Sequence, residues 1–169
     1  MRKMSWLVVC AVVIAMAANA GAQSKFSGKC NQGKPDPNYT AAVGDRPDHT
    51  ISLGKVTCTW AAGAELAGVA LKDEQDTFTS DASGKTSRDK GYGVGTLANG
   101  DKYYVTFQGT TTMEKNAPVS ATCTWNFTGG TGTLKGLTGK GTCSGKFDAT
   151  GAAVFDVQGE YAVPAAKAK

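Results

Sequence analysis

Residues 119–147, VSATCTWNFTGGTGTLKGLTGKGTCSGKF, decide the fold of this chain. Apolar and small polar residues alternate with a period of two through 119–128 and again through 137–147, which predicts two β-strands. The Gly-Gly-Thr-Gly run at 129–132 lies between them and has the composition of a turn. The stretch therefore predicts an antiparallel strand pair.

The cysteines of this stretch set a register for the two strands. With Cys123 opposite Cys143, aromatic side chains of the first strand lie over glycines of the second, which keeps a glycine-rich strand packed. The pairs are Trp125 with Gly141 and Phe127 with Gly139. We therefore expect a Cys123–Cys143 disulfide, which leaves Cys30 to pair with Cys58.

A second strand pair is predicted around Asn99-Gly100, a dipeptide that readily adopts the positive φ angles of a type I′ hairpin turn. Centring a two-residue turn there sets Tyr92 opposite Phe107, with Tyr103 on the same face. The residues that alternate with these three along the two strands would then face away from the core.

The rest of the chain has weaker strand patterns at similar spacing. These further segments lie at 51–60, 69–80 and 155–161. Leu53 and Val56 have opposite parity, which predicts a bulge near Gly54. About eight strands joined by short turns are typical of a barrel or a sandwich, and the inward glycines favour a barrel. We expect an all-β fold: a small antiparallel up-and-down barrel of about eight strands with two disulfides.

The N-terminus has the layout of an export signal. Arg2 and Lys3 precede an apolar run of about a dozen residues, shorter than the roughly 20 that span a bilayer as a helix. Small residues then offer cleavage after Ala20 or after Ala22. We expect four segments, which are a signal peptide at 1–22, an irregular N-terminal segment at 23–49, the barrel domain at 50–162 and a flexible tail at 163–169.

Charge and cysteine content exclude several classes of function. The leader carries two basic and no acidic residues, so cleavage lowers the net charge from +4 to +2, too little to indicate nucleic-acid binding. After loss of Cys10 the cysteine count is even, which in a secreted or periplasmic protein indicates disulfides. Their spacing fits no zinc site. We expect no metal, no cofactor and no membrane span after signal cleavage.

A family resemblance lies in the glycine-rich turn. Residues 127–141, FTGGTGTLKGLTGKG, resemble the glycine-rich signature of the allene oxide cyclase and dirigent barrels. Three short motifs are similar to those of a group of exported bacterial proteins: GDRP at 44–47, TSRD at 86–89 and ANGDKYY at 98–104. The cyclase resemblance implies a small eight-stranded barrel with an apolar interior and allows a trimer. It carries over no catalytic residue, because none maps onto this chain position by position.

Six aromatic side chains have the parity of the barrel interior: Tyr92, Tyr103, Phe107, Trp125, Phe127 and Tyr161. An eight-stranded barrel has an interior that side chains can fill, or that can hold one small ligand. Packing is the simpler role for these rings. Because glycines lie opposite them, a cavity for a small hydrophobic ligand is the alternative.

Polar residues near the rim form a second candidate set: Asp45, Arg46, His49 and Arg88. His49 is the single histidine, and a neighbouring Asp could orient it as a general base. Ordinary turn chemistry, with Arg46 paired to a nearby carboxylate, is the simpler explanation of the same cluster. Arg88 could bind an acidic ligand or form a surface ion pair.

No catalytic constellation stands out in the sequence, which lacks a Gly-x-Ser-x-Gly motif. The first hypothesis is therefore an exported module that binds a small apolar or aromatic ligand, or a surface partner. The alternative is a cyclase or isomerase that steers a reactive lipid-like or phenolic intermediate mainly by shape. A hydrolase would require two inward carboxylates about 5–9 Å apart in a groove.

Overall fold

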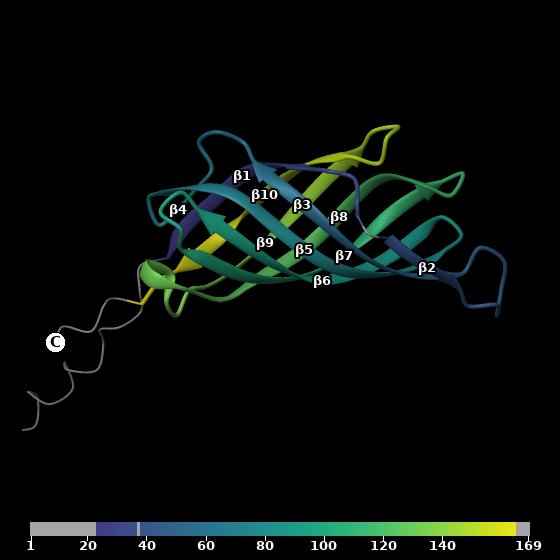
Figure 1. The fold of residues 1–169 in the computed structure, drawn as a ribbon, viewed down its shortest axis with the longest axis horizontal. Helices are drawn as coiled ribbons and strands as arrows, with labels where there is room; N and C mark the ends of the chain where they lie inside the picture. Colours follow the sequence, from purple (N-terminus) through teal and green to yellow (C-terminus); the bar gives the residue numbers. More distant parts are fainter. Residues whose placement is uncertain (1–22, 37, 165–169) are drawn as a thin grey trace, which may run out of the picture.

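The chain forms a closed antiparallel β-barrel (Figure 1), described for residues 23–36 and 38–164 by a computed structural model. The strands are β1 (Ser24–Gln32), β2 (Asn38–Ala42), β3 (Thr50–Trp60), β4 (Glu65–Leu66), β5 (Val69–Ser83), β6 (Thr86–Leu97), β7 (Lys102–Glu114), β8 (Ala117–Gly130), β9 (Thr138–Phe147) and β10 (Ala153–Ala162), with a 3-10 helix η2 at Gly132–Leu134. Eight strands form the ring in the order β3-β1-β10-β9-β8-β7-β6-β5, and the pairing of β5 with β3 closes it. The predicted all-β barrel is confirmed.

The ring closes at a short seam between β1 and β3. Only three residue pairs join these strands, from Cys30↔Trp60 to Gln32↔Cys58, whereas β1 pairs with β10 over nine. The short strand β2 pairs with the opposite half of the same β3 edge, Thr50–Gly54. The Cys30–Cys58 disulfide spans the seam, with its Cα atoms 5.5 Å apart.

The predicted register of β8 and β9 is confirmed. Cys123 lies opposite Cys143, and the two form the second disulfide. Trp125 pairs with Gly141, where an added Cβ would lie 2.3 Å from an indole carbon. The missing side chain therefore makes the room in which the ring lies.

The predicted register of β6 and β7 is wrong by one residue. Leu97 N–H donates to the Asp101 carbonyl (2.9 Å), and Gly100 N–H donates back to the Leu97 carbonyl (3.0 Å). The loop thus has three residues, and its last one, Gly100, adopts φ +87°, as in a type I turn followed by a left-handed residue. A one-residue slip exchanges the two faces of a strand.

The exchange turns Tyr92 outward and glycines inward. Tyr92 lies opposite Thr106 on the outer surface and is 72 % exposed, which contradicts its predicted interior position. Gly95 lies opposite Tyr103, and an added Cβ would be 1.8 Å from a carbon of the phenol ring. The Tyr103 ring therefore lies directly on bare backbone.

Two further predictions are corrected in the N-terminal half. The segment 23–49 is not irregular, because it contains β1 and β2; Phe26 is the single large apolar residue facing inward on β1, which made the strand pattern weak. No bulge occurs near Gly54, since β3 pairs with β5 without a break from Thr50 to Thr59. Leu53 instead points outward and is 48 % exposed.

Some predictions fall outside the described residues. The signal peptide at 1–22 and most of the expected tail lie there; Val163 and Pro164 follow β10 without strand structure. No helix within 23–36 and 38–164 is long and apolar enough to cross a membrane.

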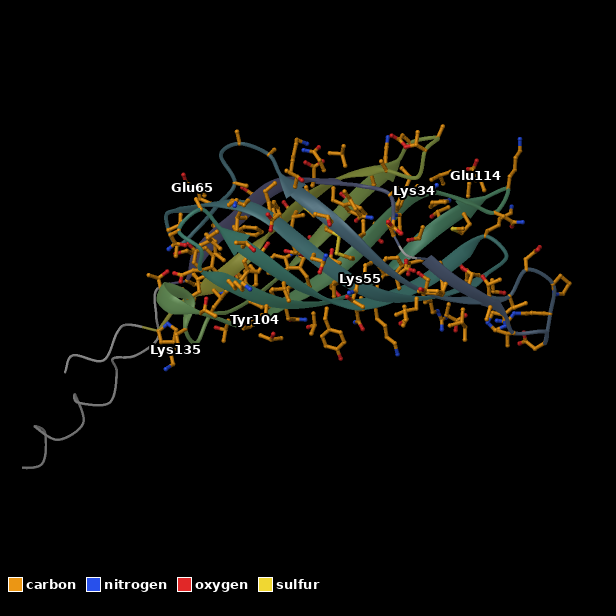
Figure 2. All side chains as sticks on the ribbon, in the orientation of Figure 1. Lys34, Lys55, Glu65, Tyr104, Glu114 and Lys135 are labelled. Atoms are coloured by element: carbon orange, nitrogen blue, oxygen red, sulfur yellow. A yellow bond between two sulfur atoms is a disulfide. The ribbon has the colours of Figure 1, made fainter. Side chains whose placement is uncertain are left out.

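Leucines close one end of the barrel, which we term the plugged end. They come from β4, β6, η2 and the η2–β9 loop, and each is at most 1 % exposed: Leu66, Leu97, Leu134 and Leu137. Figure 2 shows Glu65 and Lys135 at this end and Glu114 at the other. The opposite end carries no such plug of buried leucines among the described residues.

Removal of the seam disulfide should loosen the ring locally as well as lower its stability. For C30A/C58A we expect the free energy of unfolding to fall by about 3–4 kcal/mol on the loop-entropy model, measured by urea denaturation. C123A/C143A should cost a similar amount, because the two loops are of similar length, 28 and 20 residues.

The two variants should differ in amide hydrogen exchange. Loss of Cys30–Cys58 should expose β1 and the end of β3, whereas loss of Cys123–Cys143 leaves eight residue pairs between β8 and β9. Equal exchange protection of β1 in both variants would contradict the role assigned to the seam.

Candidate functional site

A cavity of about 450 Å³ occupies the barrel interior. Its mouth lies at the end that carries Glu114 in Figure 2, where residues at the strand ends line it, among them Thr50, Ala82, Met113 and Pro118. Deeper in, the walls are largely aromatic and aliphatic. Both disulfides contribute to this wall through Cys30, Cys123 and Cys143.

Five rings form the inner part of the cavity, which we call the aromatic floor: Phe26, Trp60, Tyr103, Trp125 and Phe127. They meet mostly edge to face, with centroids 5.6 Å apart for Phe26 and Trp125 and 5.5 Å apart for Tyr103 and Phe127. This is the arrangement that aromatic quadrupoles favour. The floor separates the cavity from the leucines of the plugged end.

A polar chain crosses the aromatic floor. Trp60 Nε1–H donates to Tyr103 Oη over 2.9 Å, and the Tyr103 hydroxyl donates to Glu74 Oε2. Burial raises the pKa of Glu74, and the hydrogen bonds from Tyr103 and Asp76 oppose that rise only in part. Burial and the adjoining Glu74 carboxyl raise the pKa of Tyr103 well above 10, so its phenol is a neutral donor.

Asp76 stands beside Glu74 and faces the same cavity. Burial raises the pKa of Asp76 well above its ordinary value, and the adjoining Glu74 carboxyl raises it further. Asp76 Oδ1 has no hydrogen-bond partner in the described part of the chain and almost no solvent exposure. Two adjoining carboxyls without a counter-charge retain a proton to higher pH than exposed ones do.

Gly93 makes the room for this carboxyl pair. A Cβ at that position would lie 2.4 Å from Asp76 Oδ1 and 2.9 Å from Glu74 Oε1. The inward position of Gly93 follows from the corrected register of β6, in which this glycine lies opposite Asp76.

A third carboxylate, Asp89, lies nearer the mouth and is fully engaged. It accepts hydrogen bonds from the hydroxyls of Ser80, Ser87 (2.8 Å) and Thr111 (2.6 Å). These bonds tie β5, β6 and β7 together across the cavity wall. Asp89 therefore has little capacity left for a ligand, in contrast to Asp76.

Four of the six predicted interior aromatics line the cavity: Tyr103, Phe107, Trp125 and Phe127. Tyr92 lies outside the barrel, as described above. Tyr161 is half-buried near the plugged end, where its hydroxyl accepts a hydrogen bond from Ala67 N–H over 2.9 Å. That a ligand binds the four remains a prediction.

The predicted rim residues gather only in part, and none of them lines the cavity. In the β2–β3 loop His49 lies between two carboxylates. Its Nδ1 is hydrogen-bonded to Asp45, and its Nε2 is hydrogen-bonded to Asp81 Oδ1 (2.9 Å). Arg46 bonds both Asp45 (3.0 Å) and Ser83 Oγ (2.8 Å). The cluster clamps this loop to the β5–β6 hairpin, which favours its structural role. Arg88 is exposed on the outward face of β6, apart from the cluster.

Sequence reasoning missed the carboxyl pair because β5 changes phase. The pairing with β6 shifts between Leu71 and Asp73. The apolar Leu71 predicts that odd-numbered residues of β5 face inward, but the shift turns the even-numbered Glu74 and Asp76 inward instead. Their shared parity with Phe78 was the available signal. Among the described residues, no group of three potential ligands is placed to hold a metal ion.

Comparison with known proteins finds a likeness of fold alone. No family model matches the chain, and no curated protein does. Among solved structures, the chain is similar to the pterocarpan synthase dirigent protein GePTS1, with 14 % identity over 96 % of this chain and 99 % of that one, at a TM-score of 0.53. A second pterocarpan synthase dirigent protein, PsPTS1, matches at 12 % identity over 84 % and 96 %, with a TM-score of 0.49. The barrel is therefore dirigent-like.

The His49 clamp should make stability depend on pH. The hydrogen bonds to Asp45 and Asp81 raise the pKa of His49 above 6.5, so its stabilisation is complete below pH 6.5 and lost as pH rises through the folded-state value. The His49 hydrogen bond lowers the pKa of Asp45 below 3.8, so that contribution is lost as pH falls through the lowered value.

We therefore expect the melting temperature of the native chain to exceed that of H49Q most between about pH 4 and 6.5, in line with this linkage. The difference should shrink toward pH 9. A difference that stays constant from pH 5 to 9 would show that protonated His49 contributes nothing.

Proposed function

We propose that this protein is an exported barrel that binds a small apolar or aromatic ligand in its cavity. The observation that carries this proposal is the open, mainly apolar cavity of about 450 Å³ with the Glu74–Asp76 carboxyl pair at its floor. Cavities of about 300–1,000 Å³ with apolar walls and a few placed polar groups are typical ligand sites. The two disulfides support a secreted or periplasmic location, where such bonds persist.

Ligand binding at this place agrees with how the interior is built. A closed eight-stranded barrel can be filled by its own side chains, but here the rings lie flat on glycines and leave space above them. An aromatic ligand placed there would bury its faces against the aromatic floor. Its polar group would meet Glu74 and Asp76, which fixes its orientation.

The neutral fluorophore N-phenyl-1-naphthylamine tests the proposal. We expect its emission to rise on binding, with energy transfer from Trp60 and Trp125 in the floor. Ala121→Phe places a ring in the cavity wall and should weaken binding at least fivefold. Thr124→Phe puts the same ring on the outer face of the same strand, so it is the matched control. Absence of binding, or equal loss in both variants, would overturn the proposal.

A second function, the directing of a reactive intermediate, is favoured by the proton that the carboxyl pair retains. A buried carboxylic acid beside a bound ligand can act as a general acid. The dirigent-like fold supports this alternative, since the similar structure GePTS1 is a pterocarpan synthase dirigent protein.

The two functions differ in their effect on products. A directing barrel should change the enantiomeric ratio of a phenolic intermediate that cyclises spontaneously, measured by chiral chromatography. Asp76→Asn should remove that effect while the fluorophore still binds. An unchanged ratio with the native chain would leave ligand binding as the function.

A further inference from the structure

We infer that the preferred ligand of this cavity is an apolar organic cation, an arylalkylamine whose ammonium group contacts Glu74 and Asp76. The inference rests on the proposed ligand-binding function and adds the chemical class of the ligand. Three observations carry it: the acidic groups of the lining, the unpartnered oxygen of Asp76, and the aromatic rings of the same cavity.

The charged groups lining the cavity are all acidic. Glu74, Asp76 and Asp89 contribute carboxyls, and no Lys, Arg or His is among the described residues that line it. The strands beside the pair add only neutral groups there, such as Trp60 from β3, Gly93 from β6 and Tyr103 from β7. A buried carboxyl pair without a cation is costly, and an entering cation removes that cost.

Asp76 Oδ1 is the atom that lacks a partner. It lies in the cavity lining, is nearly inaccessible to water and accepts no hydrogen bond in the described part of the chain. Glu74, by contrast, already accepts the Tyr103 hydroxyl. An ammonium group carries three donors and no acceptor, so it can serve both carboxyls without leaving a polar atom unpaired.

The aromatic floor suits the same ligand. Tyr103 links Trp60 to Glu74 through its hydroxyl. It also packs edge to face on Phe127, which in turn packs on Trp125. Ring faces attract cations within about 6 Å, most strongly in desolvated sites. The same rings bury the apolar part of the ligand. An anionic ligand would meet carboxyls at three wall positions, Glu74, Asp76 and Asp89.

Three probes of nearly equal shape test the inference: 4-phenylbutylamine, 4-phenylbutanol and 4-phenylbutyrate. Each competes with N-phenyl-1-naphthylamine for the full chain at pH 7.5. We expect the amine to bind at least tenfold more tightly than the alcohol, and the carboxylate to bind most weakly. Equal affinities for the amine and the alcohol would overturn the charge preference while the cavity itself still binds ligands. No binding by any probe would instead remove the proposed function.

Substitution of each carboxyl tests whether Glu74 and Asp76 cause the preference for the amine. Asp76→Asn and Glu74→Gln should each lower amine affinity about tenfold and leave alcohol affinity within twofold. Asp156→Asn removes an exposed carboxylate on the outside of β10, which pairs with Lys29, and should change neither. If D76N fails to fold, E74Q and the charge series of the native chain still decide the question. Unchanged amine affinity in a folded E74Q or D76N variant would overturn the assignment.

Discussion

The close contact of aromatic rings with bare glycine backbone is the constraint on which the rest of this barrel depends. Eight strands enclose an interior that side chains of ordinary size could fill. Tyr103 lies on Gly95, and Trp125 lies on Gly141. Each ring thereby lies close against the backbone of the neighbouring strand, which packs the floor and leaves open space above it.

The glycine pattern also decides where charge can be buried. Gly93 continues the row of inward glycines on β6 and leaves room for two carboxyls in place of a ring. Glu74 and Asp76 thus sit in an apolar wall with one phenol as their donor. The carboxyl pair and the Tyr103 ring of the aromatic floor thus both lie against glycines of β6.

Sequence patterns predicted the fold correctly where particular residues fixed the register of two neighbouring strands. Cys123 and Cys143 fixed β8 against β9, so the ring-on-glycine pairs there were placed correctly. For β6 and β7 the only marker was the Asn99-Gly100 turn, and a loop longer by one residue exchanged the two faces of β6, while Tyr103 and Phe107 of β7 face inward as predicted. Turn length depends on backbone angles that the dipeptide does not determine.

The candidate site was predictable in its aromatics but not in its acids. Strand alternation identified Trp125 and Phe127, because their strand has no irregularity before them in its pairing with β9. The phase of β5 shifts after Leu71, and the local sequence signals that shift only through the shared parity of Glu74 and Asp76 with Phe78. His49 drew attention as the single histidine, yet its partners Asp45 and Asp81 hold it in a loop clamp away from the cavity.

The pairing of the first strand with the last has a practical consequence. Ser24 lies opposite Tyr161, so both outer ends of the ring emerge side by side at the plugged end, as Figure 1 shows. A short linker from β10 back to β1 would therefore permit circular permutation with new ends in a surface turn. Likewise, a tether at either of these ends would attach the barrel to a solid support with its mouth facing the solution.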